Sequence, residues 1–300
     1  MLSIKNIKIN NIFFYLFLLF VFSCVSSEKT HKGPSGFIQI KGSDTIVNAA
    51  QKLAENFMKE YPYVFVAVTG GGSGVGIASL INSTCDIANA SRKMKKKEIE
   101  IAKKRGITPK EFVVAYDGVA VIVNKNNPID TFTIDQLHDI FTGKITNWKE
   151  IGGKEGKIVT LSREVSSGTH MYFKEKVIQL ENKNSKEEFS PQTLLLSSSQ
   201  SIVEEVVNNE NAIGYLGMGY ICDRVKAVKI GKDNKFYPPT VKYVAKGKYI
   251  LSRPLQMYTN GEPKGVIKLF IDYVYSPQGQ RVFQETGFVP IREENASEEN

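Results

Sequence analysis

The stretch VFVAVTGGGSGVGIASLIN, residues 64–82, contains a strand, a turn and a helix in immediate succession. Val64–Val68 has a β-branched valine at every second position and the aromatic Phe65 between two of them, which favours a strand. Thr69–Gly74 is rich in glycine, which permits the tight turn that must follow, and Val75–Asn82 has the apolar pattern of a short helix. Because the same order recurs along the chain, the sequence predicts an α/β fold with mainly parallel sheets.

Further elements are predicted on both sides of this unit. A capping box of Thr133 and Gln136 marks the start of one helix. The predicted strands are residues 37–40, 85–90, 113–125, 157–161, 212–217, 241–245 and 249–258, and the predicted helices are residues 45–61, 132–141, 169–180, 202–209, 263–275 and 278–285.

The N-terminus has the composition of an export signal. A positively charged start is followed by an apolar run, Ile12–Phe22, that is too short to span a bilayer. Cys24 follows at the expected cleavage point, which resembles the lipobox of bacterial lipoproteins, where the cysteine becomes the acylated N-terminus. An ordinary secretory signal with an incidental cysteine is the alternative. We therefore expect residues 1–23 to be a signal peptide and residues 24–36 to be a polar tether.

The formal charge of +8 falls to about +6 if Lys5 and Lys8 leave with the signal. A basic exported protein is suited to attract small anions. The lysine cluster at residues 93–97 has no interleaved aromatic residues, so it indicates a solvated helix start and no nucleic-acid partner. Cys85 and Cys222 are expected to be free thiols, although export permits a disulfide. The three histidines and three cysteines form no metal-ligand motif, so no metal or other cofactor is predicted.

Three predicted strand-to-helix turns share one composition: Gly42–Thr45, Gly70–Gly74 and Ser166–Thr169. Glycine lets the backbone approach a ligand, and the start of a helix offers unpaired N–H groups to an anion. Each turn alone is equally explained by helix capping. Arg163 precedes the third turn and could donate a fork of hydrogen bonds to a tetrahedral oxyanion, so the three turns together favour an anion site.

Two other interpretations of these turns are weaker. The stretch Gly70–Gly76 lacks the Gly-Lys-Ser/Thr ending of a P-loop and the spacing of a dinucleotide fingerprint. Ser167 and His170 suggest a hydrolase, but Ser167 is not flanked by the glycines of a nucleophile elbow, and no acidic residue is marked as the partner of His170.

The chain resembles the phosphate-binding lipoproteins of Pst-type ABC transporters, which are type II periplasmic binding proteins. The resemblance runs from Phe37 to Ile291. It rests on the motifs KGSDT, TGGGSGVGIASL, CDIANASRKM, FTGKITNW, REVSSGT and SPQGQRVFQETGFVPI.

The resemblance implies an α/β fold of two lobes around a central cleft. Lobe 1 would comprise residues 37–118 and 245–291, lobe 2 residues 119–244, and residues 292–300 would form a disordered tail. The two hinge crossings would lie near Tyr116–Ala120 and around Tyr243–Ile250.

The resemblance also implies the residues of a phosphate site. Members of the first lobe would be Ser43, Thr45, Ser73 and Asp86, facing Arg163, Ser167, Gly168 and Thr169 of the second; Asp44, Ile46 and Arg92 are possible additions. Asp86 would accept a hydrogen bond from the P–OH group of a protonated phosphate and thereby reject sulfate, which carries no proton at neutral pH. Some relatives place an acidic residue two positions after the arginine, where this chain has Val165, so Arg163 is either less neutralised or paired elsewhere.

The implied function is that of a receptor rather than an enzyme. It would bind inorganic phosphate, close its lobes around the anion, and deliver it to the permease subunits of an ABC transporter. It would be an exported monomer held on the membrane by its N-terminal lipid. The alternatives are a receptor for sulfate or molybdate, a phosphate-ester hydrolase on this scaffold, or an adhesion protein.

Overall fold

The computed structural model describes residues 33–291. The predicted signal peptide, Cys24, most of the tether and the acidic tail therefore lie outside the described residues. Within the described range, residues 34–291 form one compact unit. Among the described residues, no helix combines the length and the apolar composition needed to cross a membrane.

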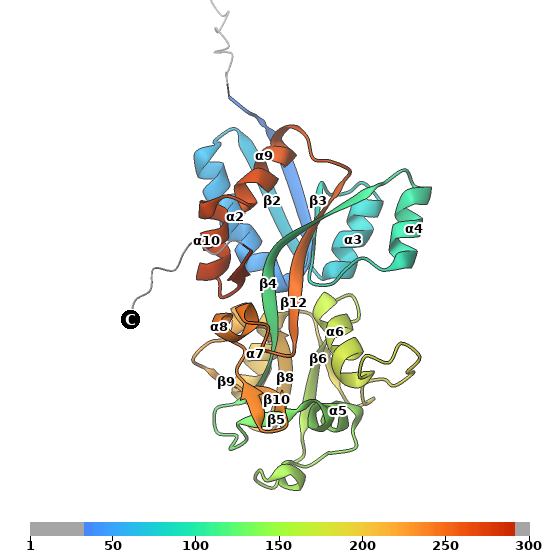
Figure 1. The fold of residues 1–300 in the computed structure, drawn as a ribbon, viewed down its shortest axis with the longest axis vertical. Coiled ribbons are helices and arrows are strands. Elements are labelled where there is room, and N and C mark those ends of the chain that lie inside the picture. The colour runs from blue at the N-terminus through green and yellow to red at the C-terminus, as the bar shows by residue number, and fades with distance from the viewer. Residues whose placement is uncertain (1–32, 292–300) are drawn as a thin grey trace, which may run out of the picture. The chain divides into compact units, whose positions relative to one another are not determined.

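The unit contains two groups of elements, here called the first and second lobes, which Figure 1 shows one above the other. In the first lobe, two parallel neighbours flank the strand β1, and helices cover both faces of the sheet. Its elements are β1 (Gly36–Gly42), η1 (Asp44–Ile46), α2 (Val47–Glu60), β2 (Val64–Gly71), α3 (Ser73–Ile81), β3 (Ile87–Ala90), α4 (Lys96–Lys104), α9 (Gly265–Val274) and α10 (Pro277–Glu285).

Two hydrophobic clusters hold the first lobe together. Ile38 and Ile40 of β1 pack with Phe57 of α2 and Phe270 of α9 on one face of the sheet. A smaller cluster joins Ile77 and the rest of the inner side of α3 to β3 on the other face. Alternate residues of a strand point to opposite faces of a sheet. The short apolar runs of the sequence therefore bury side chains on both faces of this sheet.

The second lobe has a parallel pair of strands, β6 and β8, at its centre. The helix predicted from the Thr133 and Gln136 capping box is confirmed, with both reciprocal bonds formed. The elements are β5 (Thr131–Thr133), α5 (Ile134–Thr142), η2 (Trp148–Ile151), β6 (Val159–Arg163), α6 (Gly168–Phe173), the π-helical turn η3 (Lys174–Ile178), β7 (Leu194–Leu196), α7 (Ser199–Asn208), β8 (Ala212–Gly217), η4 (Met218–Tyr220), β9 (Val225–Ala227), β10 (Lys229–Lys232), β11 (Lys235–Tyr237) and α8 (Val241–Ala245).

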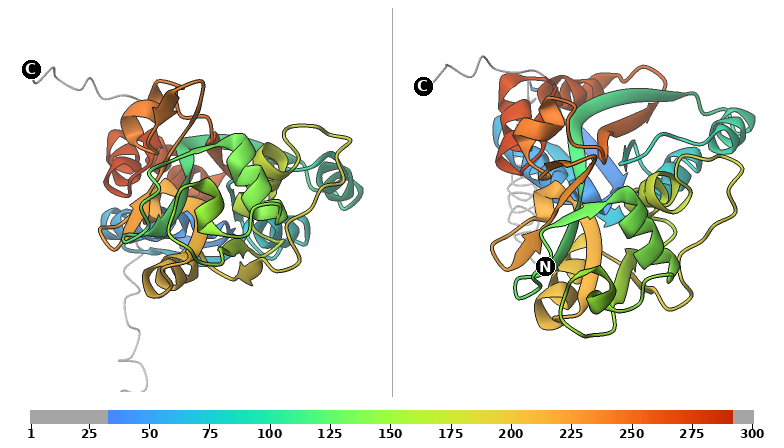
Figure 2. Two further views of the ribbon diagram at one scale, coloured as in Figure 1. Left: turned by 90° about the horizontal axis from the view of Figure 1, so that it is seen from below. Right: turned by 60° about the horizontal axis from the view of Figure 1, so that its bottom comes forward.

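Two long antiparallel strands, β4 (Pro109–Asn124) and β12 (Ser252–Asn260), run between the lobes (Figures 1 and 2). β4 pairs with β12 as far as Gly118 and with β8 from Val119 onward, so it changes partners where the lobes meet. Beyond that point its alternate residues enter two different clusters of the second lobe. The unbroken apolar run of residues 119–123 reflects burial on both faces.

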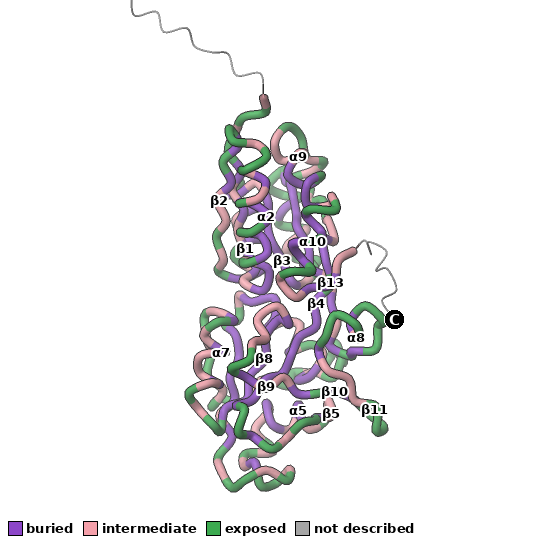
Figure 3. The backbone as a smooth tube through the Cα atoms, turned by 90° about the vertical axis from the view of Figure 1, so that its left-hand side faces the viewer, coloured by how far each residue is buried: buried purple, intermediate pink, exposed green. Residues whose placement is uncertain are grey.

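Together the strands of the described residues form a ten-stranded sheet in the order β2-β1-β3-β12-β4-β8-β6-β7, with β9 and β13 (Val289–Pro290) also paired to β4. A smaller sheet has the order β11-β10-β5. Figure 3 shows that the buried backbone follows these strands, whereas exposed segments lie mainly in the helices and loops around them.

Three details differ from the sequence predictions. Residues 241–245, predicted as a strand, form the helix α8, in which Val244 is buried and Tyr243 half-buried against the core of the second lobe, while the other three residues are exposed. The second crossing was predicted at Tyr243–Ile250, but Tyr249 and Leu251 still pack in the core of the second lobe. The crossing therefore begins with β12 at Ser252. The sheet is also mixed rather than mainly parallel, because both crossing strands run antiparallel to their neighbours.

Candidate functional site

Five hydroxyl side chains gather where the two lobes meet. Ser91 is the centre of the group: Ser43 donates to Ser91 Oγ at 3.0 Å, Thr45 donates to it at 3.4 Å, and Ser73 Oγ lies 3.3 Å away. Thr169 joins from the second lobe, with its Oγ1 2.8 Å from Thr45 Oγ1. All five side chains are buried. We call these residues the hydroxyl cluster.

The first-lobe members come together because parallel strands end at the same edge of a sheet. Gly42 pairs with Asn89 across β1 and β3, so the residues that follow the two strands, Ser43 and Ser91, emerge side by side. Ser73 begins α3 at the same edge, after Gly72, whose φ of 95° lies in the region that favours glycine. The carboxyl edge of such a sheet is the usual place for a ligand in α/β proteins.

The second lobe approaches this edge through the start of α6. Ser167 caps the helix, because its Oγ accepts hydrogen bonds from the backbone N–H groups of Thr169 and His170. A Cβ atom on Gly168 would lie 2.3 Å from Ser73 Oγ and 2.6 Å from Ser91 Oγ. Only glycine allows the two lobes to come this close.

Arg253 of β12 was not predicted as a site residue, yet it contacts the hydroxyl cluster directly. Its Nη2 donates to Thr169 Oγ1 at 3.0 Å and to Thr45 Oγ1 at 3.3 Å. Its Nη1 donates to the carbonyl oxygen of Ser91 at 3.1 Å. One guanidinium group on a crossing strand therefore donates to hydroxyls of both lobes.

Asp117 of β4 holds Arg253 in place. Its Oδ2 accepts from Arg253 Nε at 2.9 Å and from Nη2 at 2.7 Å, while its Oδ1 accepts from the backbone N–H of Met218 at 3.0 Å. The side chains are 0% and 2% exposed. Burial raises the pKa of the Asp117 carboxyl, and the adjacent guanidinium opposes that rise. In the sequence, the only sign of this pair was a charged residue within each of two otherwise apolar strands. The pairing of Asp117 with Arg253 could not be predicted, because it depends on the register between β4 and β12.

Arg163 was predicted to face the anion and is buried at the junction of the lobes. Its Nε donates to the carbonyl of Leu196, its Nη1 to Ser199 Oγ, and its Nη2 to both Asp44 Oδ2 and the carbonyl of Ser197. These four bonds occupy four of the five N–H groups of a guanidinium.

Asp44 is thus the acidic partner of Arg163. Val165, which stands where some relatives have an acidic residue, cannot fill that role. The contact joins the lobes at 2.6 Å, and the Asp44 side chain is 12% exposed. Asp44 Oδ1 also accepts from the backbone N–H of Gly71, and the Tyr220 hydroxyl donates to the Asp44 carbonyl oxygen. Asp44, predicted only as a possible addition, bonds to both lobes.

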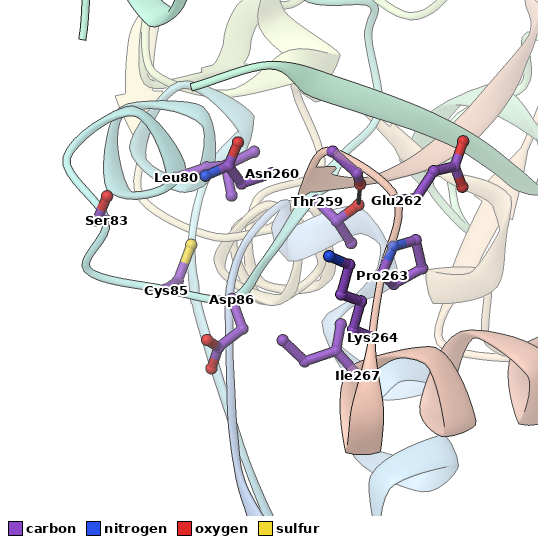
Figure 4. Close-up of a pocket in the computed structure, with 11 residues that line it drawn as sticks. Leu80, Ser83, Cys85, Asp86, Thr259, Asn260, Glu262, Pro263, Lys264 and Ile267 are labelled. Atoms are coloured by element: carbon purple, nitrogen blue, oxygen red, sulfur yellow. Dashed lines mark hydrogen bonds between the residues drawn. The ribbon is translucent and has the colours of Figure 1, made fainter. Parts of the chain in front are cut away.

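The prediction that Asp86 lines the same cleft is wrong. Asp86 lies at the opposite end of β3 from Ser91, and its Oδ2 accepts from the backbone N–H of Gln39 at 2.7 Å. Ser43 follows the end of β1, four residues beyond Gln39, so the Asp86 backbone lies roughly 13 Å from that edge. Asp86 lines a separate pocket, with a volume of about 580 Å³, together with Cys85 and Lys264. Figure 4 shows these lining residues.

The remaining predicted residues are placed as follows. Ile46 is buried at the start of α2, next to the hydroxyl cluster in sequence. Arg92 follows Ser91, but its guanidinium makes two bonds to Glu98 at 2.7 and 2.8 Å. Cys85 and Cys222 are free thiols, as predicted, and Cys222 is only half-buried.

The geometry does not support the hydrolase alternative. His170 Nδ1 lies 3.0 Å from Ser162 Oγ, which is itself 2.6 Å from the Tyr215 hydroxyl. Ser167 Oγ meets the backbone of His170 rather than its ring. Burial lowers the pKa of His170. Within residues 33–291, no three His, Cys, Asp or Glu side chains are grouped as metal ligands would be.

Comparison with known proteins places the chain in a family. Residues 27–278 match the PBP superfamily domain. Proteins named phosphate-binding protein PstS are 34% identical in Staphylococcus saprophyticus, over 88% of this chain and 83% of the relative, and 32% identical in Bacillus subtilis, over 88% and 84%. The chain belongs to this family of phosphate-binding proteins.

Solved structures agree with this assignment. A protein from Clostridium perfringens, described as a phosphate ABC transporter substrate-binding protein and solved with bound phosphate, is 35% identical with a TM-score of 0.77. The alignment covers 86% of this chain and all of that one. An ABC-type phosphate transport receptor from Vibrio cholerae is 33% identical with a TM-score of 0.67, over 84% of this chain and 99% of the receptor. The type II binding-protein fold expected from the sequence is confirmed.

Proposed function

We propose that this protein is an extracytoplasmic receptor that binds inorganic phosphate between its lobes and delivers it to an ABC transporter. The observation that carries the proposal is the hydroxyl cluster with Arg253, where donors from both lobes converge at the carboxyl edge of the first-lobe sheet. Relatives over most of the chain are named as phosphate-binding proteins and transport receptors, which favours a receptor over an enzyme.

The phosphate contacts in this proposal are mainly neutral donors. The set comprises Ser43, Thr45, Ser73, Ser91, Ser167, Gly168 and Thr169, with the Ile46 amide, and the two arginines Arg163 and Arg253. Each arginine has a carboxylate partner, Asp44 or Asp117. The anion would therefore be stabilised by hydrogen-bond dipoles and charge-assisted donors in a buried site, without a large excess of positive charge.

Closure of the lobes would complete this site. Contacts between the lobes already include the Thr45–Thr169 hydroxyl pair and the bond from the Gly74 N–H to the Ser166 carbonyl at 2.9 Å. The two crossing strands allow hinge motion, and the closed arrangement would be the form read by the transporter.

Asp44 replaces Asp86 as the carboxylate proposed to distinguish phosphate from sulfate. It lies between two members of the hydroxyl cluster in sequence, and its carboxylate sits at the junction of the lobes. An ionised carboxylate only accepts hydrogen bonds, so it tolerates an anion that carries a proton and repels one that does not. Sulfate and molybdate are therefore expected to bind weakly.

The test is calorimetric titration of unfolded and refolded protein with phosphate, sulfate and molybdate. Asp44→Asn and Asp86→Asn form a matched pair, because both remove one carboxylate charge from the first lobe. We expect tight binding of phosphate alone in the unaltered chain, reduced discrimination in Asp44→Asn, and unchanged discrimination in Asp86→Asn. Failure of the unaltered chain to bind phosphate would contradict the function. Reduced discrimination in Asp86→Asn alone would contradict the assignment of Asp44.

The membrane attachment is a separate part of the proposal. Cys24, expected to be the lipid-bearing N-terminus after removal of residues 1–23, lies outside the described residues. Mass spectrometry of protein from membranes should find an acylated cysteine at the mature N-terminus, and Cys24→Ala should release the protein in soluble form. A processed N-terminus elsewhere would favour the ordinary secretory signal. Light scattering of the detergent-solubilised chain should give the mass of a monomer.

A further inference from the structure

A basic strip lies beside the proposed phosphate site and has no role in the contacts described above. It consists of Lys93, Lys95, Lys96 and Lys97, all of them exposed. None of the four forms an ion pair with another residue in the range 33–291. The stretch of residues 92–100 contains five basic and two acidic side chains, so its net charge is positive.

The strip begins next to the site in sequence and reaches the second lobe. Ser91, the centre of the hydroxyl cluster, lies two residues before Lys93. Lys95 reaches across to the second lobe, where its Nζ lies 3.8 Å from Met171 Sδ. Met171 is two residues beyond Thr169, the second-lobe member of the cluster. In Figure 1 the strip leads into α4, which stands next to α3 with α6 below.

The strip is poorly explained as a device that stabilises α4. Lys96 and Lys97 are the first two residues of that helix, where the helix dipole disfavours cations and favours acidic side chains. Glu98 meets that preference, but its carboxylate is already bonded by Arg92 and by the Lys95 backbone N–H. The lysines therefore add positive potential where the fold does not need it.

We infer that the basic strip attracts phosphate toward the junction of the lobes and raises its association rate. Charges lining the approach to a site increase the encounter rate of an oppositely charged ligand, and salt weakens the effect. The Debye length is about 8 Å at physiological ionic strength, so only charges close to the entry path act strongly. This inference rests on the proposed function, because the attracted anion is the phosphate bound there.

The experiment compares two variants that lose equal charge. In the strip variant, Lys93, Lys95, Lys96 and Lys97 are replaced by Gln. In the control, Lys229, Lys232, Lys235 and Lys246 are replaced by Gln; these lysines are exposed, and three of them belong to β10 and β11, strands of the small sheet in the second lobe. Rapid mixing of the full chain in neutral detergent with radiolabelled phosphate gives association and dissociation rates from low salt to 1 M salt.

We expect the strip variant to bind phosphate about 3- to 10-fold more slowly at low salt, with an unchanged dissociation rate and no difference at 1 M salt. The control should match the unaltered chain. If phosphate association slowed equally in both variants, or did not slow in either, the inference would be overturned. A change confined to dissociation would instead indicate a contact with bound phosphate and would also overturn it. If the unaltered chain bound no phosphate even at 1 M salt, the proposed function would fail as well.

Discussion

Arg163 and Asp44 form an ion pair between the lobes, with Nη2 of the arginine 2.6 Å from Oδ2 of the aspartate. The guanidinium is also tied to two carbonyl groups and to Ser199 within its own lobe. These bonds fix the plane of the Arg163 guanidinium. Because Asp44 belongs to the first lobe and Arg163 to the second, their ion pair depends on the position of one lobe relative to the other. The pair couples closure to the orientation of a cation beside the site.

Arg163→Lys should weaken phosphate binding although it retains the charge. An ammonium has no planar fork and cannot keep the four bonds of the guanidinium. We expect a loss of about 2 kcal/mol, roughly 30-fold in affinity, by calorimetry. Arg224→Lys is the control, because the pair of Arg224 with Glu204 is about half exposed and lies on the surface. Equal affinities in the two variants would contradict a role for the fork.

Breaking the buried Asp117–Arg253 pair should destabilise the protein strongly. Either Asp117→Leu or Arg253→Met leaves one buried charge without its partner, which typically costs about 3–5 kcal/mol. The double variant should be more stable than either single variant, because both charges are then absent. Urea denaturation gives the free energies of unfolding.

The control for this comparison is Lys268→Met, which breaks an exposed pair with Asp272. It should change the free energy of unfolding by less than about 0.5 kcal/mol. Single variants at Asp117 or Arg253 that unfold with the same free energy as this control would show that the pair contributes no buried-charge stabilisation.

The sequence predicted the elements well where local pattern determines them. The turns at Gly42–Thr45 and Gly70–Gly74 follow strands and precede helices, as the composition indicated. Residues 241–245 were mistaken for a strand because their alternating pattern is short, and such runs do not separate strand from helix. The crossing strands were predicted only approximately, because an apolar run does not indicate which strands it pairs with or where the pairing changes.

The site was predicted in part for the same reason. Hydroxyls at helix starts could be read from the chain, but Ser91 and Arg253 depend on which strands are neighbours and on their register. Asp86 was misplaced because a matched motif spans a whole strand, and its two ends lie at opposite edges of the sheet. Residues at one edge can be distinguished from those at the other only when the strand bounds are known.

Stability should fall on mild acidification because of His170. Burial lowers the pKa of this side chain below its usual value of 6.5, so the folded state holds the neutral imidazole. The unfolded state therefore binds more protons as the pH falls below about 6.5, and stability present above that pH is lost. The loss cannot exceed about 1.4 kcal/mol per pH unit for one proton.

The measurement is urea denaturation between pH 7.5 and 5.5, in the unaltered chain and in His170→Gln. The variant should lose the pH dependence in this window, whatever its stability at pH 7.5. A dependence of the same size in both proteins would assign the effect to other groups.

Gly168→Ala should prevent closure without damaging the second lobe. The added methyl group would lie 2.3 Å from Ser73 Oγ and 2.6 Å from Ser91 Oγ, both of which belong to the other lobe. Alanine is favourable at this position within its own lobe, because Gly168 is the first residue of α6. The lobes must therefore separate, while each keeps its own core.

We expect phosphate affinity to fall at least about 10-fold, which is about 1.4 kcal/mol, with little change in thermal stability. Calorimetry measures the affinity, and small-angle X-ray scattering with saturating phosphate should show a larger radius of gyration than the unaltered chain. An unchanged affinity and radius would mean that bound phosphate does not require the close approach of α6 to Ser73.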